Sequence, residues 1–394
     1  MNAGSGEMIY LDYAATTPVD PRVAEVMMTF LTPAGVFANP ASTGHAAGRE
    51  AAEAVAQARA EAAAALHTRP ENLVFTSGAT ESDNLAIKGI ARASRRGKHI
   101  VTDKTSHKAV IDACKALEKE GFEVSWLVPE AEGRITPEQL RTALREDTAL
   151  VALLHANNET GVVNDIAELG AVCREAGVPF HVDAAQSAGK LPLNLDELPI
   201  DTLAASGHKF YGPKGIGILY VRPGFGPVEA QQHGGGHERG LRSGTLPTHQ
   251  IVGLSRALAL AVEDQLAEAE RLVGLREQLW QGLATLGGVH RNAPAEHSLP
   301  GVLNVSFEGV DGESLQFALP ALAVSAGSAC NSASREPSFV LRALGRSDRL
   351  AGASLRFSLG RWTSEQDVER AVELVTEAVS KLRAVAGALL AQGD

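Results

Sequence analysis

Two short apolar runs, each leading to a polar residue, frame the stretch 180–209, FHVDAAQSAGKLPLNLDELPIDTLAASGHK. The runs Phe180–Asp183 and Thr202–Ala205 have the length and composition of buried strands. Asp183 stands at the end of the first run, and Lys209 follows it by 26 positions, just after the second. Because parallel sheets bind ligands beyond the carboxyl ends of their strands, we expect both side chains at one cleft.

The same alternation of strand and helix extends on both sides of this stretch. It predicts a doubly wound, mostly parallel α/β sheet. The region 248–286 is rich in Ala, Leu and Glu and is predicted as one long helix leading to a second, smaller α+β unit at 288–394. The expected strands are 73–76, 98–103, 123–128, 149–155 and 216–221, and the expected helices are 46–66, 81 onward, 107–120 and 166–176.

Composition and charge exclude several classes of protein. The 394 residues carry 36 basic and 47 acidic side chains, a net charge of −11, which disfavours binding to a nucleic-acid backbone. No apolar run approaches the ~20 residues of a membrane span, and the N-terminus lacks the features of a signal peptide. We therefore expect a cytoplasmic protein without membrane or direct nucleic-acid partners, whose three scattered cysteines form no disulfide framework.

A short segment with a glycine turn, Thr76–Glu81, is a candidate anion site. It reads as the end of a strand, a turn and the start of a helix. Free N–H groups at a helix N-terminus, together with Ser and Thr hydroxyls, suit a phosphate. Ordinary capping of the helix by Thr80 explains the same pattern.

Asp183 and Lys209 together favour pyridoxal phosphate (PLP). A carboxylate at the end of a buried strand needs a positive partner, which is either a nearby arginine or cap or the pyridinium nitrogen of PLP. Lys209 follows an apolar run and the small polar residues Ser-Gly-His, which suits a desolvated, reactive amine. Lys214 is the competing lysine, in a Gly-Pro turn where we expect it to be exposed.

One of the three cysteines lies in a segment of small polar residues. Residues 325–334 show no apolar periodicity and are predicted as a mobile loop, so the thiol of Cys330 can move and react, unless it is an incidental loop cysteine. Cys114 and Cys173 fall on apolar helix faces and are expected to be inert core residues. The pair His233 and His237 flanks three glycines, which argues against a helical zinc site.

Taken together, the motifs of this chain resemble those of the IscS-type cysteine desulfurases. The resemblance runs from about residue 8 to about residue 390. It implies the type I PLP-dependent transferase fold in a homodimer, with a large PLP-binding domain at 16–261 and a small domain formed by 1–15 and 262–394. The segments that carry it are Tyr10–Pro18, Ser77–Asn84, Lys104–Lys108, Asn157–Glu159, Ser206–Tyr211, His233–Pro247 and Gly327–Cys330.

The resemblance also implies roles for individual residues. Lys209 would bind PLP covalently, Asp183 would pair with its ring nitrogen, and Gln186 would contact its phenolic oxygen. His107 would stack on the ring and transfer protons, and Cys330 would accept the sulfur. The implied phosphate contacts are Ala79, Thr80, Ser206, His208 and, across the dimer interface, Thr245; the implied groups near the substrate carboxylate are Asn158, also a cofactor contact, and Arg356.

The implied reaction converts L-cysteine to L-alanine and leaves a persulfide on Cys330. The sulfur would pass to an IscU-like iron–sulfur scaffold protein, to tRNA thiolation and to other acceptors, and Cys330 would be a transient cluster ligand shared with the scaffold. The chain departs from the family at Asn331, where Thr is common, and ends at Asp394, short of the tail that helps to dock the scaffold. The alternatives are a selenocysteine lyase, another type I PLP enzyme such as an aminotransferase, or chiefly an assembly platform.

Overall fold

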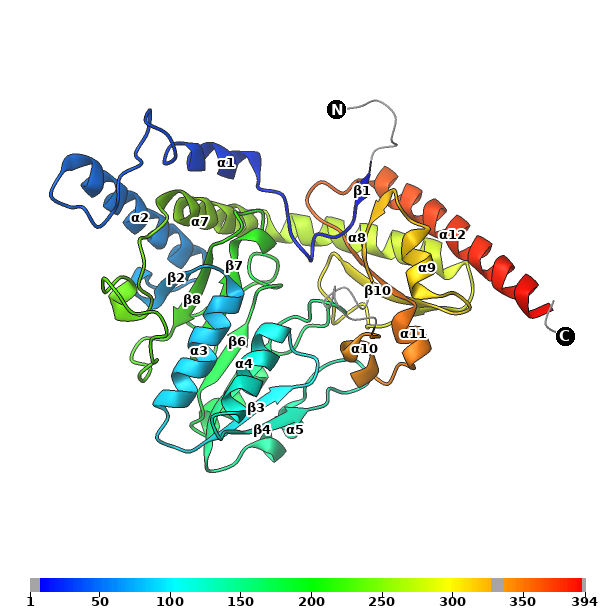
Figure 1. The fold of residues 1–394 in the computed structure, drawn as a ribbon, viewed down its shortest axis with the longest axis horizontal. Coiled ribbons are helices and arrows are strands. Elements are labelled where there is room, and N and C mark those ends of the chain that lie inside the picture. Colours follow the sequence, from blue (N-terminus) through cyan, green and yellow to red (C-terminus); the bar gives the residue numbers. More distant parts are fainter. Residues whose placement is uncertain (1–7, 327–335, 392–394) are drawn as a thin grey trace.

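A seven-stranded sheet forms the centre of the larger part of the computed structural model, which describes residues 8–326 and 336–391 (Figure 1). The strand order is β2-β8-β7-β6-β5-β3-β4, and every neighbouring pair is parallel except those of β8, which runs antiparallel to β2 and β7. The mostly parallel α/β sheet is therefore confirmed. The strands are β2 (Leu73–Thr76), β3 (His99–Asp103), β4 (Glu123–Leu127), β5 (Thr148–Leu154), β6 (Phe180–Asp183), β7 (Thr202–Ser206) and β8 (Gly217–Val221).

Helices cover both faces of this sheet, which explains why strands β5, β6 and β7 are buried along their whole length. One apolar core joins one face to α2, α6 and α7, and a second joins the other face to α3 and α4. Helix α1 packs on α7, and α5 packs on α6. The helices are α1 (Pro21–Met28), α2 (Ala46–Ala65), α3 (Ala79–Ala93), α4 (Lys108–Glu118), α5 (Pro137–Ala143), α6 (Ile166–Glu175) and α7 (Thr248–Glu263), with short 3₁₀ turns η1 (Pro70–Asn72), η2 (Gly207–Lys209) and η3 (Glu238–Gly240).

A smaller unit follows, built on an antiparallel sheet of order β12-β13-β10-β9. Its own core packs this sheet against the long helices α8 and α12. The first strand of the chain, β1, joins this unit because it pairs in parallel with β11. The elements are β1 (Ile9–Tyr10), α8 (Gln265–Ala284), β9 (Val289–Arg291), β10 (Val302–Phe307), α9 (Gly312–Phe317), β11 (Leu322–Ala323), β12 (Ser325–Ala326), α10 (Phe339–Ala343), α11 (Asp348–Gly352), β13 (Ser354–Ser358) and α12 (Glu365–Ala391).

The expectation of one helix over 248–286 is wrong. The structure has two helices, α7 and α8, which meet at Asp264. Their buried faces belong to different cores, because α7 packs on the large sheet and α8 on the small unit. Within the described residues, no helix has both the length and the apolar composition needed to cross a bilayer.

Candidate active site

A cavity of about 560 Å³ lies at the carboxyl ends of the parallel strands, between the two units. Segments from the N-terminus, from the large sheet and from the small unit all contribute to its wall. It therefore collects side chains that are up to several hundred positions apart in the chain. Ten of the residues expected at the site line it: Ala79, Thr80, His107, Asn158, Asp183, Gln186, Ser206, His208, Lys209 and Arg356.

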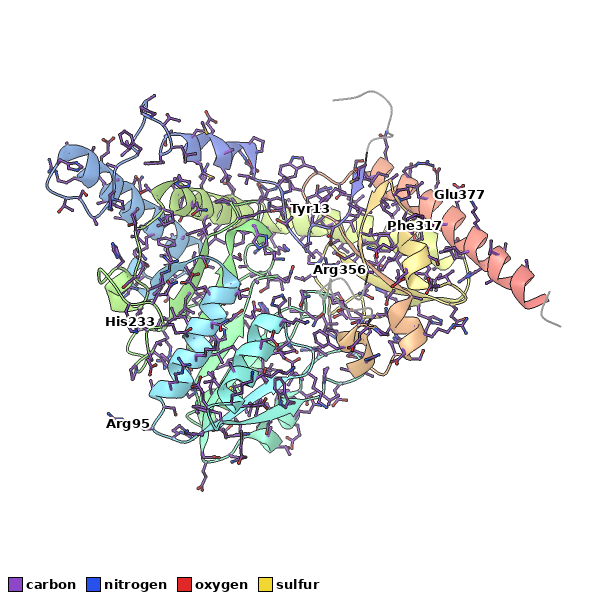
Figure 2. All side chains as sticks on the ribbon, viewed as in Figure 1. Tyr13, Arg95, His233, Phe317, Arg356 and Glu377 are labelled. Atoms are coloured by element: carbon purple, nitrogen blue, oxygen red, sulfur yellow. The ribbon has the colours of Figure 1, made fainter. Side chains whose placement is uncertain are left out.

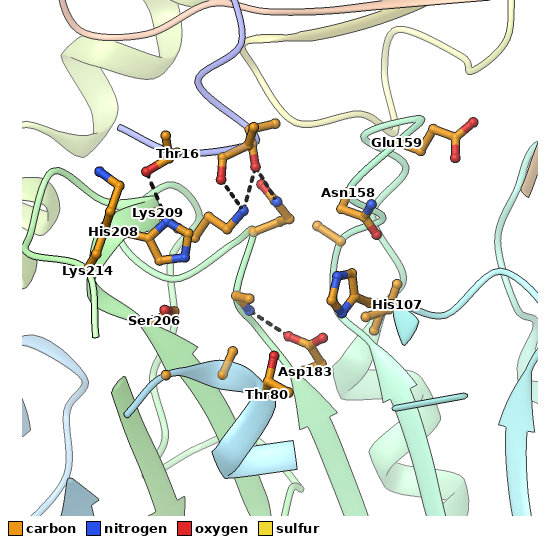
Figure 3. Close-up of a pocket in the computed structure, with 18 of the residues that line it drawn as sticks. Thr16, Thr80, His107, Asn158, Glu159, Asp183, Ser206, His208, Lys209 and Lys214 are labelled. Carbon is orange, nitrogen blue, oxygen red and sulfur yellow. Dashed lines mark hydrogen bonds between the residues drawn. The ribbon is translucent and has the colours of Figure 1, made fainter. Parts of the chain in front are cut away.

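Lys209 ends the 3₁₀ turn that follows β7, and its amine faces the N-terminal segment of the chain (Figure 3). Its Nζ donates to the carbonyl oxygens of Ala14 at 2.7 Å and Ala15 at 2.8 Å. Lys214 also lines the cavity, so both candidate lysines are at its edge. Only Lys209 of the two follows a buried strand directly.

Asp183 ends β6 and lies in the wall of the cavity with only 3% of its surface exposed. Its Oδ1 accepts a hydrogen bond from the Ala185 N–H at 2.8 Å. Burial, with a smaller contribution from the buried carboxyl of Asp83, raises the pKa of Asp183 to about 7. A cation in the cavity would reverse this effect, since an opposite charge favours the ionised carboxylate.

His107 stands across from Asp183, at the N-cap of α4 (Figure 3). Its Nδ1 accepts from the Ala109 N–H at 3.2 Å, which fixes the ring and leaves the proton on Nε2. Burial lowers the pKa of His107 below its usual value. The negative charge of Asp183 opposes this shift, and the positive charge of Lys209 adds to it. The imidazole is therefore neutral at pH 7, with Nε2–H as a donor, and it could take up a proton only at Nδ1 after releasing the Ala109 N–H.

The N-terminus of α3 forms one end of the cavity, where Ala79 and Thr80 meet Ser206. Gly78 precedes the helix with φ +153°, and a Cβ on Gly217 would lie 2.6 Å from the Gly78 Cα. This close approach brings the start of α3 against the start of β8, where Gly217 pairs with Ser206 at the end of β7. The free N–H groups of the helix and the nearby hydroxyls together make an anion cradle.

Arg356 lies at the junction of the two units, on strand β13 (Figure 2). Its guanidinium donates to the Asn158 carbonyl at 2.6 Å, to Asp12 Oδ1 at 2.7 Å and to Ser325 Oγ at 2.9 Å. Its Nε is buried and has no hydrogen-bond partner among the described residues. The side chain is thus held rigidly, and its positive charge lies at the wall of the cavity, which suits a carboxylate ligand.

Comparison with known proteins identifies the family. The model of the class-V aminotransferases matches residues 9–371. The chain belongs to this family. Cysteine desulfurase IscS of Escherichia coli O139:H28 is 57% identical over 378 residues, which cover 95% of this chain and 93% of the relative. Cysteine desulfurase IscS of Shigella boydii serotype 18 has the same identity and coverage.

Solved structures agree with this assignment. A structure described as a NifS-like protein has a TM-score of 0.89 and 37% identity, over 95% of this chain and 100% of that one. A structure of SspA in complex with cysteine has a TM-score of 0.79 and 40% identity, over 90% and 99% of the two chains. Within the class-V aminotransferases, the chain is therefore a cysteine desulfurase of the IscS type, and these enzymes are PLP-dependent.

The cavity fits the PLP of this class-V enzyme at both ends. A buried carboxylate that lacks a cation, Asp183, lies in the wall, where a pyridinium nitrogen would supply the charge. The helix end at Ala79 and Thr80 offers donors for the phosphate, and the Lys209 amine lies between the two ends. The residues present therefore match the charge pattern of the cofactor.

Two expected site residues are not among the ten, one because it lies elsewhere and one because the structure does not describe it. Thr245 is exposed and does not line the cavity of its own chain. Cys330 lies outside the described residues, as do the expected mobility of its loop and its expected role as a cluster ligand. Cys114 and Cys173 are 0% and 1% exposed, and burial raises the pKa of each thiol to about 12, which confirms them as inert core residues.

The residue-by-residue reasoning missed part of the cavity wall. It assigned no role to Ala14 or Ala15, which line the cavity, nor to Asp12, which holds Arg356, although the segment Tyr10–Pro18 was among the motifs that carry the family resemblance. It also assigned none to Glu159 or to Ser325. The contacts of Ala14 and Ala15 with Lys209 are made by backbone carbonyls, which leave no signature in residue type.

Proposed function

We propose that this cysteine desulfurase transfers the sulfur of L-cysteine to Cys330, releasing L-alanine and leaving a Cys330 persulfide. The observation that carries the proposal is the convergence of Lys209, Asp183 and Arg356 on one cavity in a chain 57% identical to IscS. An amine, a buried carboxylate and a guanidinium at the cavity wall are the three charges needed for an amino-acid substrate on PLP. When bound, PLP withdraws electrons from the α-carbon of the substrate.

Each described side chain has a task that its geometry supports. Lys209 bonds to the cofactor and is then positioned to move a proton at the substrate α-carbon. Asp183 stabilises the positive charge on the cofactor ring from the end of β6. His107, neutral in the free enzyme, takes the proton of the substrate thiol or amine at Nδ1, which then releases the Ala109 N–H. The remaining cofactor contacts in this proposal are Gln186, Asn158, Ala79, Thr80, Ser206 and His208.

Arg356 and Asn158 bind the substrate carboxylate in this proposal. The Arg356 guanidinium is anchored by Asp12 and by the Asn158 carbonyl, so it is already oriented before the substrate arrives. The Cys330 thiolate then attacks the substrate sulfur, the carbon–sulfur bond breaks, and the electron pair of that bond takes up a proton at the alanine β-carbon. Atoms balance, since one sulfur moves from cysteine to the Cys330 thiol.

The proposal extends to the assembly. Two copies form a homodimer in which Thr245, exposed in the single chain, contacts the cofactor phosphate of the partner site. The large domain covers 16–261 and the small domain 1–15 with 262–394, in line with separate apolar cores and with the pairing of β1 and β11. The enzyme works in the cytoplasm, where reduced thiols persist. It passes sulfur to an IscU-like scaffold, where Cys330 transiently ligates the nascent cluster, and to tRNA thiolation.

The test measures L-alanine and sulfide from purified holoenzyme given L-cysteine and a thiol reductant. We expect equal amounts of the two products from the wild type. Cys330→Ala should retain bound PLP and lose sulfide release, while the control Cys173→Ala, which removes a buried thiol remote from the cavity, should retain both. Full activity of Cys330→Ala would mean that the acceptor thiol is wrong. Activity on selenocysteine alone, or transamination instead of desulfuration, would replace the proposed function.

A further inference from the structure

Lys190 lies behind the active site, on the helical turn that follows β6. It is partly buried and lines a second, smaller cavity of about 40 Å³ at the seam between the two units. Tyr211 and Glu268 also line this cavity, while Gln186 lines the large one. Lys190 therefore lines the second cavity and not the large one, and the two cavities share Ala14 as a wall residue.

A chain of hydrogen bonds connects this lysine to Lys209. The Lys190 Nζ donates to Gln186 Oε1 at 3.5 Å, and Gln186 Nε2 donates to the Ala14 carbonyl at 2.9 Å. The same carbonyl accepts from Lys209 Nζ at 2.7 Å. The Ala14 carbonyl can only accept a hydrogen bond, and the Lys190 ammonium can only donate one. The two contacts together therefore place Nε2 of the Gln186 amide towards Ala14 and Oε1 towards Lys190.

The local backbone holds this arrangement in place. Gly189, with φ +73°, precedes Lys190, and a Cβ there would lie 2.9 Å from Ala261 Cβ and 3.1 Å from Phe210 Cβ. The turn that carries Lys190 is thereby packed directly against the residue that follows Lys209. A shift of either lysine is transmitted to the other through rigid contacts.

The charges around Lys190 make it an unusual residue for a purely structural task. Its ammonium is hydrogen-bonded to a neutral amide. Burial, then the nearby charges of Lys209 and Arg356, lower the pKa of Lys190 to about 7, and Glu268 opposes them. A lysine kept in such surroundings fits a functional role better than a role in stability alone.

We propose that Lys190 is a positioning residue that fixes the Gln186 amide. In the free enzyme this amide shares the Ala14 carbonyl with the Lys209 amine, and in the holoenzyme it contacts the cofactor that Lys209 holds. This inference rests on the proposed function, because it assumes that PLP is bound at Lys209. It adds a residue outside the cavity to those that control the cofactor.

The test is a pH titration of the visible absorbance band of the holoenzyme without cysteine. Four proteins form a cycle: wild type, Lys190→Met, Gln186→Ala and the double variant. We expect Lys190→Met to shift the apparent pKa of the band by about half a pH unit or more in the wild-type background. In the Gln186→Ala background, Lys190→Met should leave the apparent pKa of the band unchanged. Lys381→Met, an exposed lysine on α12, is the control for loss of one charge.

Two outcomes would overturn the proposal. An equal shift in both backgrounds would mean that Lys190 acts on Lys209 through its charge and not through the amide. A lower melting temperature of Lys190→Met with an unchanged titration would mean a structural role. If Lys190→Met does not fold, Lys190→Gln enters the cycle with the opposite expectation: it keeps a donor to Gln186, so its titration should match the wild type, and a shift would mean that the charge of Lys190 acts directly. A wild-type holoenzyme without a visible band would instead refute the proposed cofactor site, before any Lys190 variant is compared.

Discussion

The substitution Glu159→Gln should stabilise the protein in a way that depends strongly on pH. Glu159 lies in the wall of the large cavity, 4% exposed, and its Oε1 has no hydrogen-bond partner among the described residues. Burial raises the pKa of this carboxyl from 4.5 to about 7, although the hydroxyl of Ser338 and the charge of Arg356 oppose the shift. Gln has the same shape and cannot ionise.

The size of the effect follows from linkage. In the folded protein Glu159 retains its proton up to about pH 7, whereas in the unfolded chain it loses the proton near pH 4.5. The folded state therefore loses stability as pH rises between these values, by about 3 kcal/mol in total, and the loss is complete above pH 7. For 394 residues the unfolding entropy is about 0.8 kcal/mol per degree, so this loss corresponds to about 4 °C.

Differential scanning calorimetry of the holoenzyme from pH 5 to pH 8 measures this difference. The melting temperature of Glu159→Gln should exceed that of the wild type by about 1 °C at pH 5 and by about 4 °C at pH 8. Glu132→Gln, which removes an exposed carboxylate, is the control and should show no such trend. A constant difference across this range, or a variant that is less stable at pH 8, would refute the assignment of a neutral buried carboxyl.

Three further predictions concern the active site. In Arg356→Lys, the single ammonium cannot donate to both Asn158 and Asp12 as the forked guanidinium does. Loss of one charged hydrogen bond costs about 1.5–3 kcal/mol and should lower kcat/KM for cysteine by about 10–150-fold. An unchanged KM would contradict this role of Arg356. Lys209→Ala should abolish the visible absorbance of bound PLP while Lys214→Ala keeps it, and the reverse result would exchange the two lysines. His107→Gln should reduce kcat by about 10²–10⁴-fold with PLP still bound. Because the pKa of His107 is lowered, its acid limb in the pH profile of kcat should lie below pH 6.5 and disappear in the variant.

The local sequence pattern was sufficient to predict the large sheet. Strands such as Phe180–Asp183 and Leu73–Thr76 have the bounds expected from their apolar runs, because both faces of these strands are buried and the signal is continuous. The two-residue strands β1 and β11 were missed, since their pairing depends on a contact between segments more than three hundred positions apart. The break at Asp264 was missed because both helices share one composition and differ only in the core that each one faces.

In the candidate site, too, the residues with a local sequence signal could be predicted, and those that depend on tertiary contacts could not. Residues that follow buried strands, such as Asp183 and Lys209, could be identified from position and polarity alone, and the structure brings them to one cavity. Arg356 came only from family resemblance, because an arginine within an apolar strand has several ordinary explanations. The anion cradle was predicted from its glycine turn. The carbonyl of Ala14 and the lysine behind Gln186 could not be predicted, since both act through tertiary contacts.

The N-terminal segment makes its contacts with residues that are synthesised much later, and this has a consequence for biosynthesis. Asp12 forms an ion pair with Arg356, which is synthesised 344 positions later, and the Ala14 carbonyl accepts a hydrogen bond from Lys209, which also follows it in the chain. At about 5–20 residues per second, a ribosome needs roughly 20–70 s to travel from the first partner to the last. The nascent chain therefore emerges with its large sheet able to form but with an incomplete cavity. The proposed cofactor contacts within one chain, from Ala79 to Lys209, emerge well before Arg356. We therefore expect the site for PLP to form earlier in synthesis than the site for the substrate carboxylate.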